Sequence, residues 1–124
     1  MTGQAEEWLK QADYDLGTSD AMFRSRRYIY AIFMCHLCLE KALKGLLARR
    51  GELPPKSHDL VFLLDRIGID IPEHHADFLE MLNEVSVPTR YPDELDRLLA
   101  QYPRKRTAEI IGQCREVYEW LRNC

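Results

Sequence analysis

Three short groups of charged and titratable residues in this chain could do chemistry. The first is Glu40, Lys41 and Lys44, which lie in a long apolar segment, with Glu40 and Lys44 at the i, i+4 spacing of a helical ion pair. The second is the sequence Lys-Ser-His-Asp at residues 56–59, and the third is Arg-Tyr-Pro-Asp at residues 90–93. Lysine and arginine are well suited to bind phosphate, so these groups predict a site for a phosphorylated ligand.

Each group also has a structural interpretation. Glu40 and Lys44 could form a surface ion pair that adds a few tenths of a kcal/mol to stability. Arg90 could fix its own loop by pairing with Asp93 instead of reaching a phosphate. In this interpretation the three groups stabilise the fold and bind nothing.

The second group, residues 56–59, has the same two interpretations. Ser57 is expected to cap a short helix that begins at Asp59, with the aspartate favoured by the positive end of the helix. His58 would then pack across the fold or hydrogen-bond the preceding helix. In the functional interpretation, an imidazole beside a carboxylate could transfer a proton near neutral pH, and a helix N-terminus attracts phosphate.

Cysteine and histidine in the sequence Cys35-His36-x-Cys38 suggest a metal site at first sight. On a helix, however, Cys35 and Cys38 share a face from which His36 points away. A closed zinc site has four ligands, and Cys114 would have to come from a distant segment to complete it. Buried core cysteines are the favoured interpretation, with no metal. The histidines at residues 74–75 are expected at a solvated helix end.

Two clusters of basic residues lie far apart in the sequence. One is Arg24, Arg26 and Arg27, and the other is residues 104–106. The formal net charge of −3 argues against a general nucleic-acid-coating protein, which would be basic overall. A solvated loop and helix end is the favoured interpretation, with an anion or RNA patch as the alternative.

Helical periodicity of the apolar residues predicts the elements that must position these groups. The segment 28–49 is apolar on nearly all sides, so it is expected at the centre of the fold or against a second subunit. Gly51 is expected to stop it, and Pro103 to occupy the first position of the last helix. The predicted helices span residues 4–23, 28–49, 59–66, 73–85 and 93–101, followed by a last helix from residue 103. The expected fold is an all-α, antiparallel up-and-down bundle of four to five helices in a single domain of residues 1–124.

Length and composition agree with this class of protein. The chain has 124 residues, of which 46% are apolar and 30% charged, as in ordinary globular domains. No signal-peptide pattern is present at the N-terminus, and no apolar run reaches the roughly 18 residues of a membrane span. We therefore expect a cytoplasmic protein with reduced thiols, no membrane association and no cofactor.

Several short sequences together resemble those of the HEPN domain family over most of the chain. The matching sequences are Trp8-Leu-Lys-Gln-Ala-Asp-x-Asp-Leu16, the arginine–tyrosine turn before residue 28, Ala31-x-Phe33, Leu39-Glu-Lys-Ala-Leu-Lys-Gly-Leu-Leu47, Lys56-Ser-His-Asp-Leu60 and Thr89-Arg-Tyr-Pro-Asp93. The resemblance implies a compact antiparallel bundle of four or five helices, commonly a dimer.

The resemblance also implies nucleotide or RNA chemistry. Many members of the family are metal-independent ribonucleases that carry an arginine, four to six intervening residues and a histidine. Other members partner a minimal nucleotidyltransferase in toxin–antitoxin or two-component systems, and some bind nucleotides or serve as assembly modules. In this sequence no histidine follows an arginine at that spacing, and seven residues separate Arg50 from His58. The absence of the motif leaves open whether the chain is an enzyme.

These observations predict a nucleotide-binding protein, or a partner of a minimal nucleotidyltransferase in a two-component or toxin–antitoxin system. Two alternatives stay open. One is an endoribonuclease toxin with a non-standard site, in which His58 and Arg90 act on RNA, and the other is a non-catalytic homodimeric assembly module. The residues expected to contact nucleotide or phosphate are Lys41, Lys44, Lys56, His58, Arg90 and Tyr91.

Overall fold

The computed structural model describes residues 3–85 and 94–124, and these residues form six helices and no strand. The helices are α1 (Gly3–Arg24), α2 (Tyr28–Arg49), α3 (Leu60–Ile67), α4 (Glu73–Val85), α5 (Glu94–Gln101) and α6 (Arg104–Arg122). The predicted all-helical bundle is confirmed, and α2 and α4 have the bounds that the sequence predicted. None of the described helices is long and apolar enough to cross a membrane.

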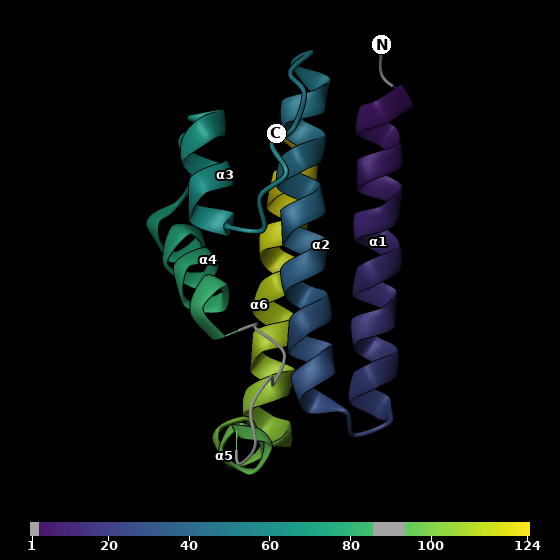
Figure 1. The fold of residues 1–124 in the computed structure, drawn as a ribbon, viewed down its shortest axis with the longest axis vertical. Helices are drawn as coiled ribbons and strands as arrows, with labels where there is room; N and C mark the ends of the chain where they lie inside the picture. The colour runs from purple at the N-terminus through teal and green to yellow at the C-terminus, as the bar shows by residue number, and fades with distance from the viewer. Residues whose placement is uncertain (1–2, 86–93) are drawn as a thin grey trace.

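Three long helices lie side by side in the bundle (Figure 1). α1 and α2 are antiparallel neighbours, and α6 runs in the same direction as α2. Contacts at both ends support that direction, because Arg104 at the start of α6 lies over Phe23 near the end of α1, while Arg49 at the end of α2 donates to the carbonyl oxygen of Cys124. The shorter α3 and α4 pack on the side of α2 that faces away from α1.

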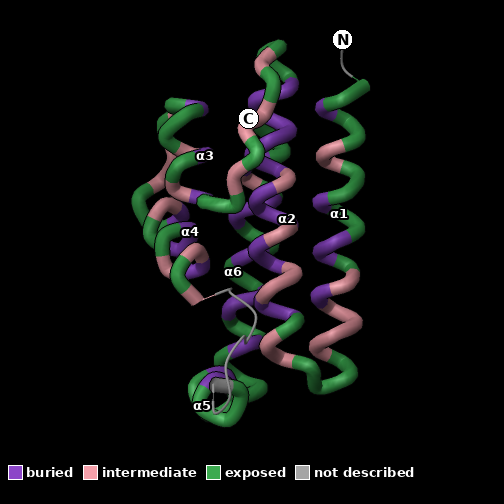
Figure 2. Tube along the Cα trace, viewed as in Figure 1, coloured by how far each residue is buried: buried purple, intermediate pink, exposed green. Residues whose placement is uncertain are grey.

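Helix α2 is the central element, as its all-round apolar sequence predicted. It contacts each of the other five described helices. Most of its residues are buried, and Figure 2 shows buried positions along nearly its whole length. Three polar side chains on α2, those of His36, Glu40 and Lys44, are buried with the apolar ones. A helix covered on several sides therefore carries charge into the interior of the bundle.

Two helix starts differ from the prediction. α3 begins at Leu60, and its N-cap is Asp59, whose Oδ1 accepts hydrogen bonds from the amides of Val61 and Phe62. Ser57 is not the cap, because its hydroxyl instead accepts from the amide of Asp59. Asp59 is the N-cap in place of Ser57 because its side chain reaches the free amides of the first turn. Pro103 likewise is the N-cap residue of α6 and not its first helical residue.

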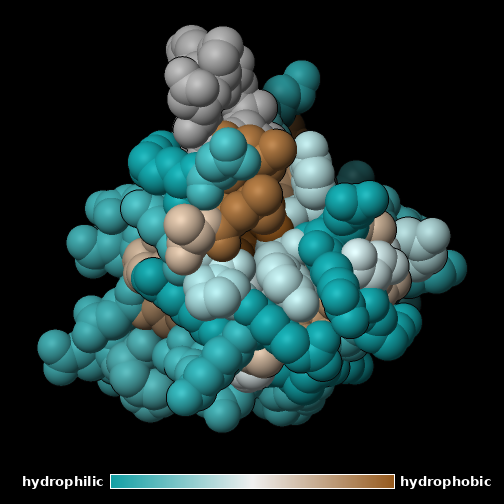
Figure 3. All heavy atoms as spheres, turned by 90° about the horizontal axis from the view of Figure 1, so that it is seen from below, coloured by the Kyte–Doolittle hydropathy of each residue, from teal (hydrophilic) through white to brown (hydrophobic). Residues whose placement is uncertain are grey.

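The turn between α1 and α2 contains an arginine in an unusual backbone conformation. Arg26 has a φ of 63°, in the left-handed region that favours glycine, and its amide donates to the carbonyl oxygen of Phe23. Figure 3 looks onto this end of the bundle and shows hydrophilic surface around an apolar patch. A charged side chain thus occupies a backbone position where glycine would be less strained.

Replacing Arg26 with glycine is expected to stabilise the fold. The left-handed conformation costs an L-residue about 1–2 kcal/mol, part of which is offset by the greater freedom of glycine in the unfolded chain. We expect Arg26→Gly to raise the free energy of unfolding by roughly 0.5–1 kcal/mol in urea titrations. Arg26→Ala is the matched control, since alanine removes the same side chain but keeps the Cβ atom that strains this conformation, and it should gain nothing. An Arg26→Gly protein less stable than the wild type would contradict the expectation.

Candidate functional site

The carboxylate of Glu40 is the centre of a buried polar cluster. Lys44 Nζ lies 2.9 Å from Glu40 Oε2, and the Nδ1 atom of His58 lies 3.0 Å from both carboxylate oxygens. Glu40 and Lys44 are 4% and 6% exposed, respectively. The interpretation of this pair as a surface ion pair is therefore wrong, because α1 and the loop after α2 cover this part of α2. Buried charges of this kind require each other as partners.

His58 joins the loop after α2 to this cluster. Its Nδ1–H donates to the Glu40 carboxylate, so the predicted hydrogen bond to the preceding helix is present. The side chain is nevertheless 82% exposed, which leaves most of the ring in solvent. The backbone of His58 is held as well, because its carbonyl oxygen accepts from His36 Nε2 at 2.7 Å. An exposed imidazole fixed by a buried carboxylate is an arrangement that can transfer protons.

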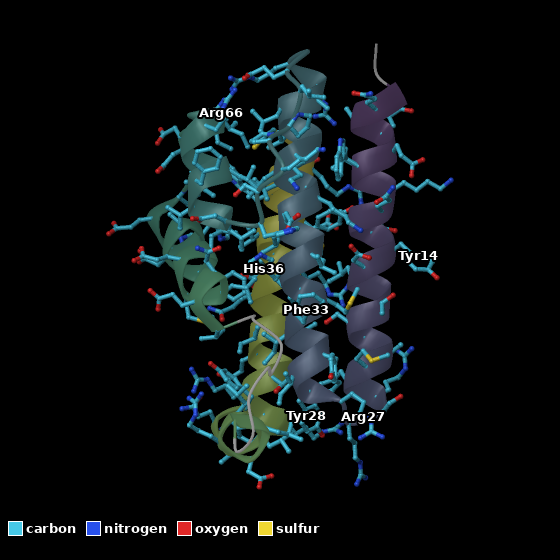
Figure 4. The ribbon with its side chains drawn as sticks, in the orientation of Figure 1. Tyr14, Arg27, Tyr28, Phe33, His36 and Arg66 are labelled. Carbon is cyan, nitrogen blue, oxygen red and sulfur yellow. The ribbon has the colours of Figure 1, made fainter. Side chains whose placement is uncertain are left out.

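His36 lies beneath this loop on α2, and Figure 4 shows it facing away from α1. Burial lowers the pKa of His36, and hydrogen bonds with the backbone of His58 and Leu82 and the charge of Glu40 offset part of that effect. Its Nε2 lies 3.7 Å from Glu40 Oε1. His36 is therefore a neutral donor that holds the His58 backbone in place near neutral pH.

A cavity of about 380 Å³ opens beside Lys44, between the first turns of α1 and the loop after α2. Its walls include the indole of Trp8, the side chains of Lys44 and Lys56, and the two prolines at residues 54–55. Lys44 Nζ lies 5.6 Å from the centre of the Trp8 ring. One aromatic face, two ammonium groups and an apolar wall are thus brought together from three segments of the chain.

Gly45 lets α1 come this close to α2. A Cβ atom at this position would lie 3.3 Å from the Cβ of Trp8 and 3.4 Å from the Cγ of Leu9. A larger residue would push α1 away and widen the cavity. The absence of a side chain at Gly45 therefore positions the Trp8 ring.

The structure separates the two lysines that the sequence grouped together. Lys41 Nζ lies 2.8 Å from a buried oxygen of Asp15 on α1 and ties the two helices together. Lys41 does not line the cavity, whereas Lys44 and Lys56 do. Arg90 and Tyr91, which were expected to contact phosphate, lie outside the described residues.

Three of the four cysteines lie in the core, as the sequence favoured, and the fourth, Cys124, is exposed. Cys35, Cys38 and Cys114 are fully buried, and the thiol of Cys114 donates to the carbonyl oxygen of Cys35. Hydrogen bonds with the thiols of Cys35 and Cys38, together with burial, raise the pKa of Cys114. Over the described ranges, no group of three or more His, Cys, Asp or Glu side chains is placed to hold a metal ion.

The expectation of a solvated helix end at residues 74–75 is wrong for one of the two histidines. His74 is exposed, but His75 is only 8% exposed and lies 6.1 Å from the ring of Trp120. Adjacent helical residues point in different directions, so one ring faces α6 and the other faces solvent. Burial and the neighbouring charge of His74 lower the pKa of His75.

Two features of the site were missed from the sequence alone. Trp8 was not among the residues expected to contact a ligand, and Glu40 was expected to pair only with Lys44. A signal for the first was present, because Gly45 is a lone glycine among large residues within a helix and directly follows Lys44. Such a glycine often marks a close approach of another segment.

Comparisons with known proteins agree with this architecture. Residues 5–124 match the family model described as HEPN domain. The solved structure of TT1696 from Thermus thermophilus superposes with a TM-score of 0.83 at 26% identity, covering 97% of each chain. The structure of ST0689, an archaeal HEPN homologue, gives a TM-score of 0.77 at 27% identity over 97% of this chain and 96% of that one. A search of curated proteins found no match.

Breaking the buried ion pair should destabilise the protein strongly. We expect Lys44→Met and Glu40→Leu each to lower the free energy of unfolding by about 3 kcal/mol, because each leaves a buried charge without its partner. The double variant should lose much less than the sum, and urea denaturation measures all three. Glu7→Gln is the control, since Glu7 is exposed and should change stability by less than about 0.5 kcal/mol. Additive losses would contradict a coupled pair.

The lowered pKa of His36 predicts a loss of stability in acid. The unfolded state takes up a proton near pH 6.5, whereas folded His36 stays neutral to lower pH, so stability is full above about 6.5 and falls below it. The same sign holds for His75. Thermal melts between about pH 7.5 and 5.5 should show a smaller decline for His36→Gln, which retains a donor near the Nε2 position, than for the wild type. Equal declines would show that His36 does not contribute.

Proposed function

Since this chain belongs to the HEPN domain family, we propose that it binds a nucleotide in the cavity beside Trp8, Lys44 and Lys56. The observation that supports this proposal is the placement of an indole ring and two ammonium groups around one cavity. The volume of about 380 Å³ lies within the roughly 300–1,000 Å³ of small-molecule sites. No other cavity recorded in the described part of the chain combines an aromatic wall with two lysines.

The chemistry of the walls suggests how a nucleotide would lie. The Trp8 indole offers a face on which a base can stack, and the prolines at residues 54–55 add apolar surface to the same cavity. Lys56 is exposed at the rim and can approach a phosphate, whereas Lys44 is already paired with the carboxylate of Glu40. Lys56, a mobile point charge, is therefore the lysine of the lining that can approach a phosphate, and Glu7, which also lines the cavity, offsets part of its charge.

The second part of the proposal is a protein partner. We propose that the nucleotide site works together with a minimal nucleotidyltransferase in a two-component or toxin–antitoxin system. The family resemblance of the chain supports this, together with the absence of the arginine–histidine spacing typical of the ribonucleases. Copurification with a small nucleotidyltransferase encoded by the neighbouring gene would support it. A neighbouring gene of another class would argue against it.

A ribonuclease remains the second candidate because His58 and Glu40 form an imidazole–carboxylate pair with the ring exposed to solvent. Such a pair can act as a general base without a metal. Cleavage of bulk RNA in EDTA by the wild type, but not by His58→Ala, would support this candidate. RNA that stays intact with the wild type as well as with His58→Ala would exclude ribonuclease activity.

A homodimeric assembly module is the third candidate. The side chains of Phe33, Met34 and Leu37 on α2 are only half-buried in the single chain, and Tyr30 is exposed. Light scattering at high concentration distinguishes a dimer from a monomer, and a monomer would remove this candidate.

Nucleotide binding can be followed at Trp8 itself. In a Trp120→Phe background, Trp8 is the single tryptophan, and millimolar ATP or GTP should quench its fluorescence and raise the melting temperature. Ligand at about ten times its Kd adds about 1.4 kcal/mol to stability.

Lys56→Gln should weaken this binding several-fold because it removes the free cation at the rim. Lys10→Gln, an exposed lysine of α1 away from the cavity, is the matched control and should bind as the parent does. Unchanged fluorescence and melting temperature at millimolar ATP and GTP would contradict the proposed site.

A further inference from the structure

Two basic segments that are far apart in the sequence meet at one end of the bundle. The guanidinium of Arg104 lies 4.9 Å from the centre of the Phe23 ring, which places the start of α6 against the end of α1. An ion pair of 2.9 Å between Arg115 and Asp20 fixes the same two helices further along. We call the exposed side chains gathered here the basic end; they are Arg24, Arg26, Arg27, Arg104, Lys105 and Arg106.

The charges of the basic end are not neutralised within the described chain. No described carboxylate forms an ion pair with any of the six side chains, whereas Lys41, Lys44 and Arg115 each pair with an acid. Carboxylates do occur on neighbouring turns. Asp20 is engaged by Arg115, Glu109 lies one turn into α6, and α5 contributes Asp96 followed by Arg97. The positive charge is therefore local in a chain whose formal net charge is −3.

Two arginines of the basic end are held in place while their charge stays exposed. Arg104 stacks on Phe23, and Arg106 lies 4.7 Å from the centre of the Tyr102 ring and donates to the carbonyl oxygen of Gln101. A guanidinium that rests on an aromatic face keeps further N–H groups for a second partner. Arginines ordered in this way lose less conformational freedom when they bind phosphate.

The backbone at this end adds to the positive electrostatic potential of the side chains. The N-termini of α2 and α6 both open here, and neither N-cap residue provides a side-chain hydrogen bond to the first turn. Helix N-termini carry partial positive charge and free amides. Arg26 keeps a charged side chain at a φ of 63°, where glycine would be less strained.

We infer that the basic end binds the phosphate chain of a linear polyanion, as found in a single-stranded nucleic acid or in inorganic polyphosphate. The cations are spread over two segments, and none of them lines a cavity recorded in the described part of the chain, so a single small anion would not be enclosed. A chain of phosphates can contact both segments at once. The exposed tyrosine at position 30, within the first turn of α2, offers a face for a base where the chain carries bases.

This surface is separate from the proposed nucleotide cavity. Figure 4 places Arg27 at the basic end and Arg66 at the opposite end of the bundle. The cavity is lined by residues of the first turns of α1 and of the loop after α2, and no residue of the basic end takes part in it. The two inferences can therefore fail independently.

Fluorescence anisotropy of labelled oligo(U) and oligo(dT) of about 12 nucleotides tests the inference, with inorganic polyphosphate as competitor. Contacts to about four to six phosphates predict that a plot of log Kd against log salt concentration has a slope between about 3 and 4. Arg24→Gln/Arg27→Gln and Arg104→Gln/Arg106→Gln should each weaken binding at least tenfold. Equal competition by polyphosphate would identify the phosphate chain alone as the ligand, whereas a preference for an oligonucleotide would identify a nucleic acid.

Three control variants keep the test decisive. Arg26→Gly should weaken binding several-fold while raising the melting temperature, so the loss of affinity is not a loss of folding. Arg66→Gln/Arg122→Gln removes two exposed arginines elsewhere, and Lys10→Gln removes an exposed lysine outside both the basic end and the nucleotide cavity; both should change the affinity less than twofold. No binding of any probe at low salt, or an equal loss in the Arg66/Arg122 control, would overturn the inference.

Discussion

The site in this protein depends on one buried carboxylate. Glu40 lies on the helix that forms the centre of the core, and a charge in that environment is tolerated only with partners. Lys44 supplies the countercharge from the same helix, and His58 supplies a hydrogen bond from the loop that follows. The hydrogen bonds of His58 with Glu40 and with His36 hold that loop, and with it the lysine and prolines at residues 54–56, against α2. Fold and site are thus joined through the polar contacts of one loop residue.

Helix α2 contributes both to the core and to the candidate site. Contacts with five other helices cover α2 on most sides, which explains why its sequence is apolar almost all round. Its buried polar residues are covered by α1 and by the loop that follows α2. A loop can carry backbone carbonyls and flexible side chains to a buried charge more easily than a packed helix can. This arrangement places titratable groups at the boundary between the interior and solvent.

Much of the fold could be predicted from the sequence because helical periodicity is a local signal. The bounds of α2 and α4, the central role of α2 and the core cysteines followed from the spacing of apolar residues. The site was less predictable, since it depends on which segments become neighbours. The burial of Glu40 and Lys44, the separation of Lys41 from Lys44 and the role of Trp8 all arise from the packing of α1 on α2. His75 was missed for the same reason, because Trp120 comes from the last helix.

Gly45 has a consequence for how the cavity is maintained. Because a Cβ atom at this position would already press on Trp8 and Leu9, close packing of the two backbones fixes the spacing of α1 and α2 here, and with it the point where the indole is attached. The part of the cavity that these two helices form therefore exists before a ligand arrives, and binding requires little backbone ordering there. Any adjustment to the shape of a ligand would fall to the Trp8 side chain and to the loop at residues 53–56.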